Sequence, residues 1–119
     1  MESGDKMGPL VASKVQVLPL RQVNWRGRSG RFYGLVPLRL HDFTLRDGEL
    51  YLVALGNHVL WAGSADDIVK DSTSRARFRL ALDCADRAFL VGASTDEVER
   101  LTTIWDLEGA EPVSGVVAA

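Results

Sequence analysis

A continuous stretch decides the fold: Glu49-Leu50-Tyr51-Leu52-Val53-Ala54-Leu55-Gly56-Asn57-His58-Val59-Leu60-Trp61-Ala62. The apolar run from Leu50 to Leu55 predicts a buried central strand. Gly56-Asn57 supplies a turn, and His58 to Ala62 predicts the returning strand. We therefore expect residues 49–62 to form a β-hairpin at the centre of a sheet.

Further strand signals precede this hairpin. Residues 14–20 alternate as a strand does, and Pro19 either places this strand at a sheet edge or ends it. Residues 35–43 are apolar around Pro37, which predicts an edge or bent strand. Asp47-Gly48 is a hairpin-turn signal, because it tolerates the positive φ angles of a type I′ turn.

The second half of the chain has helical features. Ser64 is a candidate N-cap for a short turn over 65–69. Residues 75–88 carry an apolar stripe at helical spacing and are rich in alanine, so we expect a helix, although 75–82 also alternate as a strand would. Residues 87–91 predict a strand.

A second helix is predicted near the C-terminus. Ser94-Thr95-Asp96-Glu97 matches a capping box, and Val98, Leu101 and Trp105 follow at helical spacing. Gly109 and Pro112 end this helix.

Together these elements predict one α+β domain over residues 14–109, between a flexible lead (1–13) and a flexible tail (110–119). We expect an antiparallel sheet of about four to five strands, with two helices in the C-terminal half packed on one face. The length of 119 residues fits one domain.

The composition limits the cellular compartments and the kinds of functional site that we expect for this protein. The single cysteine, Cys84, excludes an internal disulfide, and its neighbouring carboxylates favour a small buried hydrophobe over a reactive thiol. With no signal peptide and no membrane-length apolar run, we expect a cytoplasmic protein that does not bind membranes. No zinc-ligand spacing, phosphate loop or nucleophile elbow is present, so we expect no metal, cofactor or catalytic residue.

The net charge of −2 conceals a division along the chain. Residues 6–41 contain seven basic residues and no acidic one, whereas residues 42–119 contain seven basic and fourteen acidic residues. Such asymmetry is typical of an interaction surface.

Arginine and aromatic residues are interleaved over residues 21–33. This combination suits a protein partner, or a nucleic acid through phosphate neutralisation and base stacking, while the alternative is a solvated loop whose aromatic side chains pack inward. The candidate contact residues are Arg21, Trp25, Arg26, Arg28, Arg31 and Tyr33.

The hairpin and the segment after it resemble the GIY-YIG endonuclease family. The resemblance covers residues 49–107 and rests on Tyr51, Gly63 and Ser64. It implies a hairpin followed by helix, strand and helix, and phosphodiester hydrolysis by two tyrosines, an arginine and a metal-binding glutamate. Tyr51 and Trp61 stand at the two tyrosine positions. The arginine position falls near Asp71, with Arg75 or Arg77 close to it, and the glutamate position falls near Thr102, with Glu97 and Glu99 displaced from it. Because Trp61 has no hydroxyl group, the resemblance implies an inactive relative.

The leading hypothesis is therefore a small non-catalytic binding module for a protein partner or for another copy of the chain. The alternatives are a nucleic-acid-binding or inactive nuclease-like domain, and a structural subunit of a larger particle.

Overall fold

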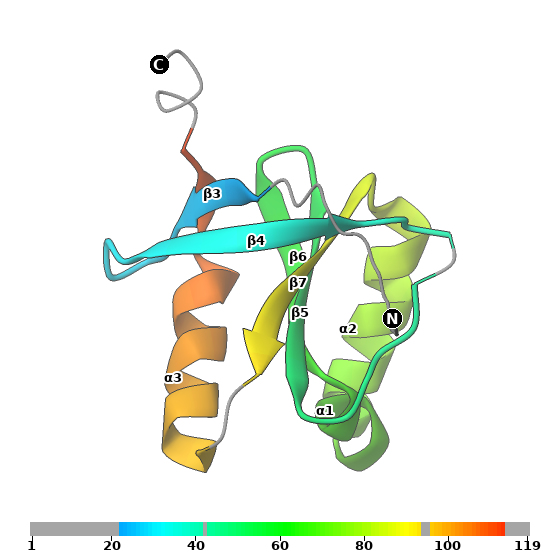
Figure 1. Cartoon of the computed structure of the whole chain (residues 1–119). Helices are drawn as coiled ribbons and strands as arrows, with labels where there is room; N and C mark the ends of the chain where they lie inside the picture. The colour runs from blue at the N-terminus through cyan, green and yellow to red at the C-terminus, as the bar shows by residue number, and fades with distance from the viewer. Residues whose placement is uncertain (1–21, 42, 94–95, 114–119) are drawn as a thin grey trace, which may run out of the picture.

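A computed structural model of the chain describes residues 22–41, 43–93 and 96–113 (Figure 1). The predicted strand at 14–20, the lead 1–13 and Arg21 lie outside the described residues. In chain order the elements are β3 (Val23–Arg26), β4 (Phe32–Leu38), β5 (Glu49–Leu55), β6 (His58–Ser64), α1 (Ala65–Lys70), α2 (Ser72–Cys84), β7 (Arg87–Ala93), α3 (Glu97–Glu108) and β8 (Glu111–Pro112).

The predicted α+β class is confirmed, but the sheet is larger than expected. It has six strands in the order β6-β5-β7-β4-β3-β8, and every neighbouring pair is antiparallel. The expectation of four to five strands was wrong, because two segments that were not expected as strands, Val23–Arg26 and Glu111–Pro112, pair with each other as β3 and β8. This pairing extends the folded part of the chain beyond residue 109.

The sheet curls because β4 changes partners along its length. Its first half pairs with β3 and its second half, from Val36 to Leu38, pairs with β7. Figure 1 shows β4 crossing β5, β6 and β7 at a steep angle. The expected bend near Pro37 agrees with this change of partner.

The central hairpin is confirmed. β5 and β6 pair from Leu50↔Ser64 to Leu55↔His58, and Gly56 takes the positive φ angle of +59° at the turn. The turn at Asp47-Gly48 also forms, with φ +82° at Gly48, but it does not join paired strands. β7 lies between β4 and β5, so the hairpin predicted there was wrong.

The two long helices lie on opposite faces of the sheet, not on one face. Alternate residues of β5 belong to different hydrophobic clusters: Leu52 packs with Leu107 of α3, whereas Val53 packs with Ala81 of α2. Figure 1 accordingly shows β5, β6 and β7 between α3 and α2. A strand covered on both faces is apolar throughout, which explains the unbroken run at 50–55.

The helix boundaries follow local capping chemistry. Ser64 caps α1 in a capping box with Asp67, as its sequence position predicted. Asp96 caps α3 by accepting a hydrogen bond from the Val98 amide, so the capping box predicted over residues 94–97 was wrong: Glu97 is the first residue of the helix. Residues 72–84 form a helix, which settles the helix–strand ambiguity. Cys84 at the end of α2 is exposed, so the prediction of a buried thiol was wrong.

Candidate interaction surface

The loop between β3 and β4 is fixed against α3 by one buried carboxylate. Asp106 of α3 is only 3% exposed, and its two oxygens accept hydrogen bonds from the Ser29 amide (2.6 Å), the Ser29 hydroxyl (2.8 Å) and the Tyr33 hydroxyl (2.7 Å). The Arg28 amide also donates to the Asp106 carbonyl at 3.0 Å. Residues 27–31 therefore form a surface turn that is anchored to α3 by hydrogen bonds.

The electrostatics of this contact favour a charged carboxylate. Burial by itself raises the pKa of Asp106, but the hydrogen bonds from Ser29 and Tyr33 outweigh it, so the pKa lies below its usual value. Burial, together with the adjacent Asp106 carboxylate, raises the pKa of Tyr33 to about 12. Near neutral pH, Tyr33 therefore donates to an ionised Asp106.

Two of the predicted contact residues are buried. Trp25 has no exposed surface and packs edge-on against Phe89, with ring centroids 5.5 Å apart. Tyr33 is bound to Asp106, as described above. Neither can contact a partner in this structure, so these two assignments were wrong. Phe32, on the opposite side of β4 from Tyr33, is 62% exposed.

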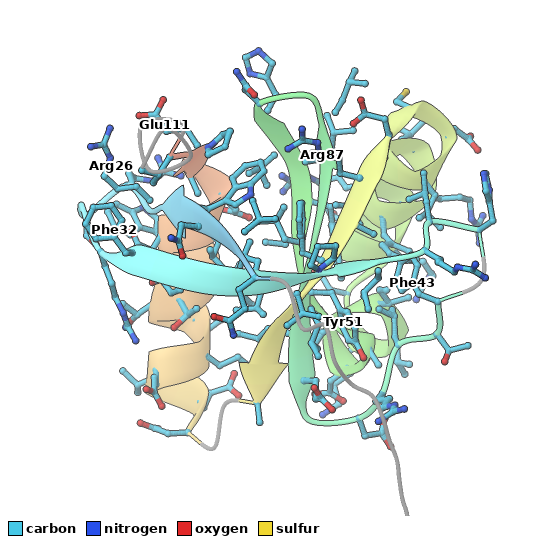
Figure 2. The ribbon with its side chains drawn as sticks, turned by 45° about the horizontal axis from the view of Figure 1, so that its top comes forward. Arg26, Phe32, Phe43, Tyr51, Arg87 and Glu111 are labelled. Atoms are coloured by element: carbon cyan, nitrogen blue, oxygen red, sulfur yellow. The ribbon has the colours of Figure 1, made fainter. Side chains whose placement is uncertain are left out.

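The three described arginines of the segment do not form one face. Arg26 lies on the outer side of the hairpin, where it pairs with Glu111 at 3.0 Å (Figure 2). The guanidinium of Arg28 stacks 4.7 Å from the ring centroid of Trp105 and donates to the Trp105 carbonyl. Arg31 stacks over Tyr33, at 5.0 Å.

An apolar stripe runs along the side of α3 that faces away from the sheet. It consists of Val98, Leu101 and Trp105, which are 71%, 52% and 52% exposed. The opposite side of the helix carries the core residue Leu107 and the half-buried Ile104. α3 is thus apolar on its inner side and also on its outer side. With Arg28 at its C-terminal end, this outer stripe is named the α3 face.

The sequence spacing of Val98, Leu101 and Trp105 predicted the helix correctly but could not give the direction of this stripe. Asp106 was missed altogether. Its only sequence signal is a carboxylate between the apolar residues Trp105 and Leu107, which is also typical of an exposed helical position.

The four residues proposed from the nuclease resemblance each contact a different partner. The Tyr51 hydroxyl accepts from the Arg46 amide at 2.9 Å, and the Trp61 indole donates to Ser74 at 3.0 Å. Arg75 donates to two carbonyls at the end of α1, and Glu97 pairs with Arg100. Tyr51 and Trp61 share one hydrophobic cluster.

A polar network joins α1 to α3 beside the end of the central hairpin. Arg100 donates to both carboxylate oxygens of Asp67 at 2.8 Å and to Glu97 at 2.8 Å. Burial alone raises the pKa of Asp67, but Arg100 and Ser64 lower it overall. Hydrogen bonding to Arg100 lowers the pKa of Glu97 as well. Arg100 is therefore an internal connection between helices.

A cavity with a volume of about 430 Å³ lies beside Tyr51 and Phe43 (Figure 2). Its lining combines apolar side chains with Arg39, Arg46 and Glu49, which gives it no single charge. Within the described part of the chain, no group of three or more His, Cys, Asp or Glu side chains is placed to hold a metal ion.

Comparisons with protein-family models, curated proteins and solved structures give no match for this chain. Among the helices of the described ranges, none is both long and apolar enough to cross a membrane.

Proposed function

We propose that the protein is a non-catalytic module that binds a protein partner through the α3 face. The observation that carries the proposal is the outward stripe of Val98, Leu101 and Trp105 on a helix whose opposite side is already buried. Exposed apolar side chains at helical spacing on one surface are typical of a docking site for an apolar segment of another protein.

The composition of the face supports a protein partner. Trp and Arg dominate the binding energy of protein interfaces, and here Arg28 is stacked directly on Trp105. The stack orders both long side chains before binding, which lowers the entropy lost on association. A fitting partner has an apolar stripe of its own and a carboxylate that reaches Arg28.

Affinity capture from the native cell with the full chain as bait tests this function. We expect Trp105→Ala and Arg28→Ala each to reduce capture of a specific protein, and the Arg28 contribution to weaken with salt. Leu80→Ala, which truncates an exposed leucine of α2, is the matched control and should capture normally. Equal capture by the wild type and the Trp105→Ala variant would contradict the proposal.

A further inference from the structure

We infer that the partner of the α3 face is the same face of a second copy of this chain. In this dimer the two α3 helices pack antiparallel about a two-fold axis. The inference rests on the proposed function and identifies the partner; it does not add a second site. Three features of the face carry it: its spacing, its charge and its size.

The spacing makes the stripe complementary to itself. Val98 and Trp105 are seven residues apart, which is about 10 Å along a helix, and Leu101 lies close to their midpoint. In an antiparallel pair Leu101 therefore meets Leu101 of the partner subunit across the axis. Trp105, the largest side chain of the stripe, meets the small Val98 of the partner subunit. A two-fold interface requires this self-complementarity.

The charges select the antiparallel orientation. Arg28 is stacked on Trp105 at the C-terminal end of the stripe, whereas Glu97 and Glu99 occupy the first turn of α3 at the other end. Antiparallel packing brings Arg28 of each copy to the acidic first turn of the other. Parallel packing would place Arg28 beside Arg28 and the acidic turns beside each other, which is unfavourable.

The same features explain why a second copy fits better than an arbitrary segment. A segment that complements the α3 face has an apolar helical stripe, with carboxylates beyond one end of it to pair with Arg28. The helix α3 itself has both features. Three apolar side chains and a charged rim make a small interface, below about 1,200 Å² in total, so the association is weak and depends on concentration.

Sedimentation velocity on the full chain, from about 10 μM to about 1 mM, tests the inference. The wild type should shift from monomer to dimer over this range. Leu101→Glu and Leu101→Lys should each weaken dimerisation at least tenfold, because like charges then meet at the axis. An equimolar mixture of the two variants should dimerise again. Leu80→Glu, which places a charge on an exposed leucine of α2, should behave as the wild type.

Two further measurements keep the test decisive. Far-UV circular dichroism establishes that each variant is folded, and Val98→Glu provides a second disruption at a 71% exposed position if Leu101→Glu does not fold. Trp105 becomes buried in the dimer, whereas Trp25 and Trp61 are buried already, so tryptophan emission should shift to shorter wavelength as concentration rises.

A wild type that stays monomeric at the highest concentration would overturn the dimer. If that monomer still captures another protein in a manner that Trp105→Ala abolishes, the proposed function stands and only the second copy is rejected. If the monomer captures no other protein, both the proposed function and the dimer are rejected. Dimerisation that neither Leu101 variant weakens, or that their mixture fails to restore, would overturn the antiparallel two-fold arrangement.

Discussion

Asp106 determines where the β3–β4 hairpin lies relative to α3. Its carboxylate holds the Ser29 amide, the Ser29 hydroxyl and the Tyr33 hydroxyl, and all three bonds cross from the first strand pair to the last helix. A buried carboxylate is tolerated because these charge-assisted bonds replace water. One side chain thus connects segments that are far apart in the chain: Asp106 is 73 residues from Tyr33 and 77 residues from Ser29.

We predict that Asp106→Asn lowers the free energy of unfolding by about 1–3 kcal/mol, because an amide cannot accept all of these bonds and brings unpaired donors into a buried site. Urea denaturation monitored by circular dichroism measures the change. Asp83→Asn, at an exposed position of α2, is the control and should be within about 0.5 kcal/mol of the wild type.

The same residue predicts a pH dependence. The pKa of Asp106 is lower in the folded protein than in the unfolded chain, so its contribution to stability is present above the unfolded value of about 3.9. The contribution is lost as the pH falls through the folded pKa. Unfolding measured between pH 7 and pH 2 should therefore show a shallower acid-induced loss of stability in Asp106→Asn. Parallel pH curves for the two proteins would contradict this assignment.

Gly27 is required for the close approach of the loop to Asp106. A Cβ atom at Gly27 would lie 2.5 Å from the Asp106 carboxylate, which is held in place by its hydrogen bonds. We expect Gly27→Ala to destabilise the protein by about 1–3 kcal/mol in thermal unfolding. Gly34→Ala is the matched control: the atom closest to its Cβ would be the terminal Oε1 of the exposed Gln22 side chain, at 2.6 Å, and this end of the side chain can move. Equal effects of the two substitutions would show that the loop is not held tightly.

At the scale of elements, α1 and α3 are joined through Arg100. The short helix α1 has no buried residue of its own, so its position depends on caps and ion pairs. Arg100 reaches Asp67 at 2.8 Å with both side chains about four-fifths buried. Paired charges with little solvent access are screened less than surface pairs and interact more strongly.

We predict a coupling free energy of about 1–3 kcal/mol between Asp67 and Arg100 in a double-mutant cycle of Asp67→Asn and Arg100→Gln. Chemical denaturation of the four proteins measures it. The exposed pair Asp66–Lys70, at 3.2 Å within α1, provides the comparison and should give about 0.5 kcal/mol or less. A coupling for Asp67–Arg100 no larger than for Asp66–Lys70 would contradict the role of Arg100 as a connection between helices.

At the scale of the whole molecule, the charge division along the sequence is partly satisfied within the fold. The basic β3–β4 hairpin pairs with the acidic C-terminal segment through the ion pair of Arg26 with Glu111, and the charge of Arg31 helps to lower the pKa of Asp106. The division is therefore a weaker indication of an external partner than the sequence alone suggested. The apolar α3 face, to which Arg28 contributes, is the stronger indication.

Because these arginines also make contacts within the fold, we predict that replacing Arg26, Arg28 and Arg31 together by Ala lowers the stability of the protein as well as its association with a partner. We expect a loss of about 1–2 kcal/mol, mainly from the two cation–π contacts, since the Arg26–Glu111 pair is half-exposed. Thermal unfolding at low and high salt measures it. Replacing the exposed Arg77, Arg79 and Arg87 by Ala is the control and should have a smaller effect. An unchanged melting temperature would leave the arginines with no role in folding.

Several local features could be predicted because their causes lie within a few residues. The hairpin at 49–62, the N-cap Ser64 and the two long helices follow from turn chemistry, capping and apolar spacing. The strand β8 was missed because Glu111-Pro112 carries no strand signal and is held only by its pairing with β3. Trp25 and Tyr33 were assigned to the surface because an arginine-rich neighbourhood does not reveal which side of a strand faces the core.

The sequence by itself determined the central hairpin, the Ser64 cap and the two long helices, because helix caps, turns and apolar periodicity act over short distances. Only the tertiary structure decided that β7 separates β4 from β5, that α2 and α3 cover opposite faces, and that Asp106 fixes the hairpin. It also decided that Val98, Leu101 and Trp105 face outward. The physical reason is that strand order and the direction of a helix face depend on contacts between distant segments, which local patterns do not encode.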